Sequence, residues 1–102
     1  MHREYMDQVL KLLAEESAFR PVGWSAQEVS EFRILVQCAR AARLDTDLRN
    51  TRMLRIVPDD AGDSSKGRAT LSSGRVLNLT FKNHSSQCTV VFELLITEVE
   101  TP

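Results

Sequence analysis

The last third of the chain contains two runs in which apolar and polar residues alternate. The first run is Arg75–Lys82 (RVLNLTFK) and the second is Cys88–Glu98 (CTVVFELLITE), with the polar stretch Asn83–Gln87 between them. Alternation with a period of two is typical of strands with one buried face, and the short polar connection favours an antiparallel hairpin. Two further strands are predicted upstream, at Thr51–Val57 and Arg68–Leu71.

The connections between these strands have the composition of turns. Ser72, Ser73 and Gly74 fit a three-residue hairpin loop with the glycine in the left-handed region. Pro58–Gly67 (PDDAGDSSKG) combines proline, aspartate, glycine and serine, which is typical of a flexible, solvated loop. We therefore expect a four-stranded antiparallel meander whose first two strands are joined by this loop.

The N-terminal half shows helical periodicity. Over Arg3–Ala18 the apolar residues recur at three- and four-residue spacing, which predicts an amphipathic helix. A second helix is expected over Ala26–Arg43, because Ser25 and Glu28 have the spacing of a capping box, in which each side chain accepts from the backbone N–H of the other. Leu44–Asn50 fits either a restarted helix or a short connection.

Together these elements predict a single α+β domain over residues 1–102. In it, two N-terminal helices pack on one face of a four-stranded antiparallel β-meander. A chain of 102 residues with 42% hydrophobic and 26% charged residues can bury an ordinary globular core. No apolar run approaches the about 20 residues that a transmembrane helix needs, so no membrane partner is expected. Cys38 and Cys88 are interpreted as core residues of an intracellular protein, either cytoplasmic or nuclear.

Charge is unevenly distributed along the chain. The net charge is −1, yet residues 33–55 contain six arginines and only two aspartates. Arg33, Arg40 and Arg43 are spaced to lie near one stripe of the second predicted helix. A row of guanidinium groups can hold carboxylates by bidentate hydrogen bonds, so this stripe predicts a surface for an acidic protein segment. The alternative is a solvated face whose arginines pair with nearby carboxylates.

The last predicted strand is apolar on both faces. Val91 and Leu95 lie on the face opposite the regularly apolar positions, with Glu93 between them. The last strand of a meander tends to lie at an edge, where an uncovered apolar strand invites pairing. Val91, Glu93 and Leu95 are therefore predicted to contact a partner strand or a second copy of the chain. Alternatively, the first helix or a different strand order covers this strand within the chain.

No catalytic or metal-binding set is recognisable. His84 and Cys88 are four residues apart, but neither a third ligand nor an orienting group lies nearby, so a solvated loop histidine is expected. We predict no cofactor, no metal and no catalytic residue. Nucleic acid is disfavoured as a partner because the chain is acidic overall and has no aromatic residues to spare for base stacking.

The leading hypothesis is a non-enzymatic protein-interaction domain, a scaffold or subunit that forms homodimers or binds an acidic partner. A runner-up comes from Pro21–Val36 (PVGWSAQEVSEFRILV), which resembles the opening of RelE/ParE-type toxins of toxin–antitoxin modules. The resemblance implies a short strand ending near Trp-Ser, and an RNA-cleaving activity in which Arg49, Arg52 and Arg55 would be tested first. The preceding helix and the acidic C-terminus depart from that family. A third hypothesis is an RNA-binding domain that uses the arginine stripe.

Overall fold

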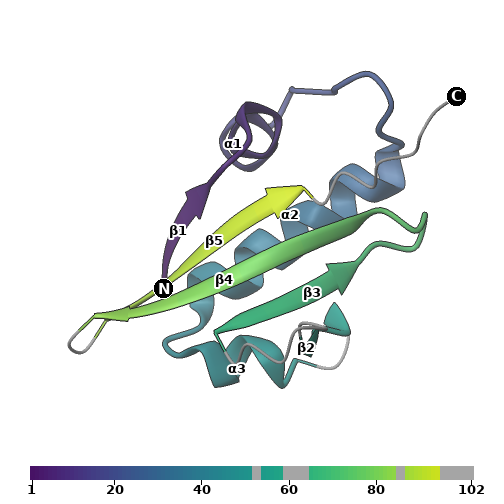
Figure 1. The fold of residues 1–102 in the computed structure, drawn as a ribbon. Helices are drawn as coiled ribbons and strands as arrows, with labels where there is room; N and C mark the ends of the chain where they lie inside the picture. Colours follow the sequence, from purple (N-terminus) through teal and green to yellow (C-terminus); the bar gives the residue numbers. More distant parts are fainter. Residues whose placement is uncertain (52–53, 59–64, 85–86, 95–102) are drawn as a thin grey trace, which may run out of the picture.

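The computed structural model describes residues 1–51, 54–58, 65–84 and 87–94. Its elements follow in the order β1 (His2–Tyr5), α1 (Gln8–Glu15), α2 (Ala26–Ala41), α3 (Asp45–Arg49), β2 (Val57–Pro58), β3 (Lys66–Thr70), β4 (Val76–His84) and β5 (Gln87–Leu94). The strands form one sheet in the order β1-β5-β4-β3-β2 (Figure 1). The α+β class is therefore confirmed, with five strands and three helices in the described residues.

The prediction for the N-terminus is wrong at its start. The first three residues of the predicted helix Arg3–Ala18 belong instead to β1 (His2–Tyr5), which runs parallel to β5 with Tyr5 opposite Phe92. The helix itself begins only at Gln8. The spacing of apolar residues favoured one long helix. The extended β1 instead pairs with the backbone N–H and C=O groups of β5, which would otherwise be unpaired at the edge of the sheet. For the same reason the predicted edge position of the last strand is wrong, since β5 lies between β1 and β4.

The remaining strands form the predicted antiparallel meander, with different bounds. Only Val57 of the predicted strand Thr51–Val57 lies in β2, and residues 52–53 are outside the described residues. Residues before β2 cannot continue the strand as regular extended backbone, because Arg55 has a φ of 51°. Both ends of the predicted loop Pro58–Gly67 are in strands, where Pro58 pairs with Gly67. The prediction that this loop is flexible falls on residues 59–64, which lie outside the described residues.

The two later hairpins follow the turn chemistry of the sequence. Gly74 has a φ of 98°, so it occupies the left-handed position predicted for it. The hairpin between β4 and β5 is tighter than predicted, because His84 pairs with Gln87. Leu44–Asn50 contains the short helix α3, and Asp47 Oδ2 accepts from the backbone N–H of Leu44 at its start.

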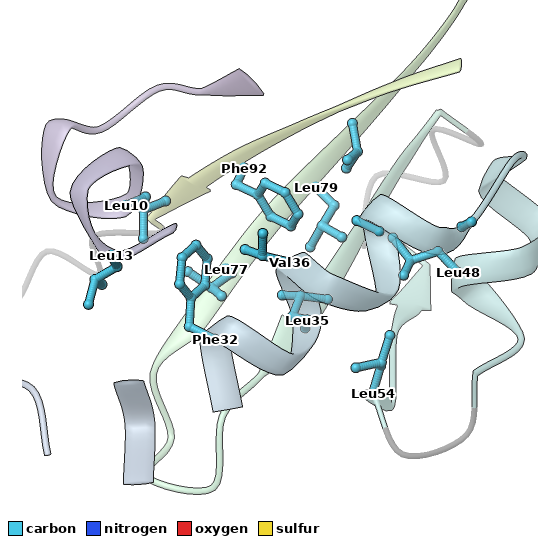
Figure 2. Close-up of a cluster of buried hydrophobic side chains, with 14 of the residues drawn as sticks. Leu10, Leu13, Phe32, Leu35, Val36, Leu48, Leu54, Leu77, Leu79 and Phe92 are labelled. Atoms are coloured by element: carbon cyan, nitrogen blue, oxygen red, sulfur yellow. The ribbon is translucent and has the colours of Figure 1, made fainter. Parts of the chain in front are cut away.

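All three helices contribute to one core on one side of the sheet (Figure 2). The cluster includes Leu10, Leu13, Phe32, Leu35, Leu48, Leu77, Leu79, Val90 and Phe92. Phe92 lies between two aromatic rings: Tyr5 stacks on it at 5.6 Å and Phe32 meets it edge-on at 5.8 Å between ring centroids. Leu10 and Leu13 of α1 and Phe32 of α2 therefore belong to the same core.

A buried carboxylate joins the start of α2 to the turn between β3 and β4. The predicted capping box is present, with Ser25 Oγ accepting from the Glu28 N–H at 3.1 Å and Glu28 Oε1 accepting from the Ser25 N–H at 2.9 Å. The second carboxylate oxygen accepts from Arg75 Nε at 2.7 Å and from Ser73 Oγ at 2.6 Å. The hydrogen bond from Arg75, followed by those from Ser73 and Ser25, lowers the pKa of Glu28 to about 2.

This network predicts that acid weakens the fold. Because the folded-state pKa of Glu28 is lowered, its stabilisation is complete above about pH 4.5 and is lost as the pH falls toward about 2. The shift corresponds to on the order of 3 kcal/mol of unfolding free energy. Glu28→Gln should lower the unfolding free energy at neutral pH and flatten its decline in acid, as measured by urea denaturation. Glu93→Gln, the control, removes an exposed carboxylate and should keep the wild-type profile. An unchanged acid profile for Glu28→Gln would contradict this role of the network.

The position of β1 predicts that truncating Tyr5 lowers the unfolding free energy more than truncating the adjacent Met6. Tyr5→Ala removes a half-buried ring stacked on Phe92 and should cost about 2 kcal/mol of unfolding free energy. Met6→Ala should cost less than about 0.5 kcal/mol, because that side chain is 66% exposed. Both values are measurable by denaturant unfolding. A larger loss of unfolding free energy in Met6→Ala than in Tyr5→Ala would instead support a helix that begins at Arg3, in which Met6 belongs to the apolar stripe.

Candidate functional site

A cavity of about 340 Å³ lies between β1, α1 and α2, and its walls are strongly basic. We call it the arginine cavity, after Arg3 of β1 and Arg33 and Arg40 of α2. Its uncharged polar lining residues are Tyr5, Ser17 and Gln37, its acidic one is Glu15, and its apolar ones are Leu13, Ala14 and Val36. Three guanidinium groups from two elements distant in sequence therefore face one hollow.

Periodicity and strand register explain this convergence. Arg33, Gln37 and Arg40 are spaced four and three residues apart on α2, so they share one face of the helix. Arg3 and Tyr5 are two residues apart on β1 and lie on one side of the strand. The parallel register places Arg3 opposite Val90 and Tyr5 opposite Phe92, two core residues, so both side chains lie on the helix-covered face.

Arg33 has a structural role as well as a place in the cavity. Its Nε donates to the carbonyl oxygen of Leu13 at 3.0 Å, and its Nη2 donates to those of Glu16 at 3.0 Å and Phe19 at 3.4 Å. The last carbonyls of a helix have no intrahelical partner, so Arg33 satisfies acceptors that α1 leaves open. This guanidinium holds α1 against α2 and is locked in position at the cavity wall.

The three arginines of the cavity form no ion pair with a described residue, and the one carboxylate in the lining, Glu15, leaves a positive net charge. Arg3 Nη1 donates to the Met1 carbonyl oxygen at 3.0 Å, and the side chain of Arg40 is exposed. Across the described ranges, no carboxylate oxygen lies within 4.0 Å of the guanidinium nitrogens of Arg3, Arg33 or Arg40. Such an arrangement favours an anion, because guanidinium groups bind carboxylates through paired, charge-assisted hydrogen bonds.

Tyr5 adds a neutral donor at the same cavity. Burial raises the pKa of its hydroxyl, and this effect outweighs the opposing influence of the Arg3 guanidinium. The phenol therefore keeps its proton near neutral pH and can donate to an anion.

Only two of the three arginines of the predicted stripe lie at the same site. Arg33 and Arg40 line the arginine cavity, whereas Arg43 lies beyond the end of α2 and is absent from its lining. Sequence reasoning missed Arg3 and Tyr5, because they were placed in a helix. The sequence offers no clear strand signal here, because three consecutive polar residues, His2, Arg3 and Glu4, precede Tyr5 and lead directly into a helical pattern.

The residues predicted on the last strand lie elsewhere. Val91 is 6% exposed and, like Glu93, points to the sheet face away from the helices, because it alternates with core residues Val90 and Phe92. Leu95 is outside the described residues. The uncovered edge that motivated this surface is occupied by β1, so its role in partner binding stays a prediction.

The three arginines suggested by the toxin resemblance do not share one site. Arg49 Nε bonds Asp45 Oδ2 at 3.1 Å and its guanidinium lies 4.5 Å over the Phe81 ring, so it helps hold α3 on the sheet. Arg55 lines a different cavity, and Arg52 is outside the described residues. The short strand that the resemblance implies before Trp24 is also absent, because residues 16–24 contain only turns and irregular backbone.

Other chemistry has little support in the described residues. Both cysteines are free thiols, and burial followed by the nearby Asp45 carboxylate raises the pKa of Cys88, which disfavours a thiolate nucleophile. No cluster of three or more His, Cys, Asp or Glu side chains suited to a metal ion occurs in the part of the chain that the structure describes. In those same ranges, no helix is long and apolar enough to cross a membrane.

Comparison of the chain with protein-family models, with curated proteins and with solved structures finds no significant match. The arginine cavity is therefore a candidate site on the strength of its own geometry and charge.

The hydrogen bonds of Arg33 predict that its removal weakens the fold. Arg33→Lys keeps the charge but cannot bridge three carbonyls as a planar fork, and it should cost about 1–2 kcal/mol of unfolding free energy. Arg40→Gln, at an exposed position whose side chain has no hydrogen bond to a described residue, should change stability by less than about 0.5 kcal/mol. Urea denaturation of both variants checks this. Equal costs would contradict the structural role of Arg33.

Proposed function

We propose that this chain is a non-enzymatic protein-interaction domain, a scaffold or subunit that binds an acidic segment of a partner protein at the arginine cavity. One observation carries the proposal: Arg3, Arg33 and Arg40 line one cavity and, among the described residues, none of them is paired with a carboxylate. Three positive charges against the single carboxylate of Glu15 leave the cavity positive, and a further anion would offset the remaining repulsion.

The size of the cavity favours a side chain over a whole cofactor. At about 340 Å³ it is at the lower end of the range for small-molecule sites. A carboxylate on a short stem could enter and accept from two guanidinium groups. Tyr5 and Gln37 would supply further donors that orient the carboxylate plane.

The position of β1 suits an extended partner. This strand ends the sheet, so one side of its backbone faces no other strand of the described chain (Figure 1). A segment added beside β1 would present alternate side chains to the face that carries Arg3 and Tyr5. Acidic residues at every second position of such a segment would reach the arginine cavity.

RNA is the weaker candidate for the same cavity. Its guanidinium groups could bind phosphates, but recognition of single strands also needs aromatic faces for base stacking. Tyr5, the aromatic residue in the cavity lining, already stacks on Phe92. We further propose an intracellular location, because the free thiols Cys38 and Cys88 are typical of reducing compartments.

Binding of a labelled oligoglutamate peptide, followed by fluorescence anisotropy, tests the proposal. Arg3→Gln and Arg40→Gln should each weaken binding about three- to tenfold, which is about 0.7–1.4 kcal/mol per lost charge. Binding should also weaken as salt is raised, and oligoglutamine should not bind.

Two matched variants act as controls for charge. Lys82→Gln removes one positive charge from the sheet face away from the helices and should weaken binding less than about twofold. Arg43→Gln, outside the cavity, should behave like Lys82→Gln. Equal losses in all four variants would show attraction by net charge and contradict a built site. Tighter binding of oligouridylate than of oligoglutamate would favour the RNA-binding hypothesis, and growth arrest on expression would favour the toxin hypothesis.

A further inference from the structure

A second, larger cavity of about 840 Å³ lies on the other flank of α2, toward β3. We call it the apolar cavity. Ile34 and Leu35 line it from α2, Leu54 from the segment before β2, and Ala69 and Leu71 from β3 and the residue after it. In Figure 2, Leu54 lies at the end of the core remote from Leu10 and Leu13. The two cavities are therefore on opposite sides of the same helix.

A small residue on β3 helps to explain the hollow. Ala69 is a buried position of this strand that lines the cavity, and it offers less side-chain volume than Leu77, Leu79 and Phe81 do on β4. Ile34 remains 39% exposed beside the gap, although it is a large aliphatic residue. The lining also includes the polar or charged residues Glu31, Arg55, Thr70 and Ser72. A volume of about 840 Å³ that combines apolar surface with such polar groups is typical of small-molecule sites.

Arg55 at the cavity has an unusual backbone. Its φ of 51° is the only positive φ at a non-glycine residue in the described ranges. A left-handed conformation costs an ordinary L-residue about 1–2 kcal/mol, and such strain persists where surrounding structure imposes it, commonly at binding sites. The Arg55 side chain is exposed, and no described residue forms an ion pair with it.

The acidic residue of this cavity is already satisfied. Glu31 Oε1 accepts from the Ser72 backbone N–H at 3.0 Å, and Oε2 accepts from Gln27 Nε2 at 3.3 Å. Hydrogen bonds from Ser72 lower the pKa of Glu31, so it stays ionised and bound to the turn before β4. Glu31 therefore remains a negative charge that is held at the turn, and the guanidinium of Arg55 is the charged group of the lining that has no ion pair with a described residue.

We propose that the apolar cavity binds a small amphipathic carboxylate. The aliphatic or aromatic body of the ligand lies against Ile34, Leu35 and Leu71, and its carboxylate accepts hydrogen bonds from Arg55. The apolar surface supplies attraction in proportion to the area removed from water, and the guanidinium selects the anion. This site is separate from the arginine cavity and does not depend on the proposed acidic partner.

Titration with decanoate, decanol and decylamine at about pH 7 tests the proposal, with binding followed by the amide NMR signals of the protein. Decanoate below its micelle concentration should shift the signals of Ile34, Ala69 and Leu71, and should bind more tightly than the other two compounds. Arg55→Gln should weaken decanoate binding about tenfold and leave decanol binding unchanged.

Two further variants test whether the Arg55 side chain, at this cavity, binds the carboxylate. Arg55→Gly should weaken decanoate binding to the same degree while keeping a denaturation midpoint at or above that of the wild type, because glycine adopts a positive φ without strain. Arg40→Gln, in the arginine cavity, should leave decanoate binding unchanged.

Four results would overturn the proposal. They are no decanoate binding, tighter binding of decylamine or decanol than of decanoate, unchanged decanoate affinity in Arg55→Gln, and signal shifts confined to the arginine cavity.

Discussion

The parallel pairing of β1 with β5 is the constraint on which the rest of the structure depends. It encloses β5 between two strands and places Phe92 between the rings of Tyr5 and Phe32. It also brings the beginning of the chain to the end of α2, where the Met1 nitrogen donates to the Ala39 carbonyl oxygen at 2.9 Å. Without this pairing, Arg3 would not reach the face of α2 that carries Arg33 and Arg40, and the arginine cavity would not form.

Helix α2 is fastened at several points along its length. The Glu28 network holds its first turn to the turn between β3 and β4, and Arg33 holds its middle to the end of α1. A helix about 10 Å wide covers roughly two strands spaced about 4.8 Å apart, whereas this sheet has five strands. Other elements must therefore cover the sheet on both sides of α2. Incomplete filling beside α1 leaves the arginine cavity, and incomplete filling beside the segment around Leu54 leaves the apolar cavity.

The two cavities have contrasting chemistry because different elements complete them. On the β1 side, a strand with alternating Arg3 and Tyr5 meets the polar face of α2, so the lining is basic. On the β3 side, Ala69 and Leu71 meet Ile34 and Leu35, so most of the lining is apolar, and Arg55 is part of it. An anion suits both sites, but the first favours a carboxylate on an exposed segment and the second a carboxylate on an apolar body.

Local features of the sequence determined much of this fold. Period-two alternation predicted the hairpin of β4 and β5, Gly74 predicted the turn before β4, and the Ser25–Glu28 capping box predicted the start of α2, because each depends on neighbouring residues alone. The tertiary structure alone decided that His2–Tyr5 is a strand and that β5 is internal, because four residues carry too weak a pattern to outweigh the helical spacing that follows. The stripe of Arg33 and Arg40 was visible in the sequence, whereas Arg3 joined it through a pairing between residues almost ninety positions apart, which no local periodicity encodes.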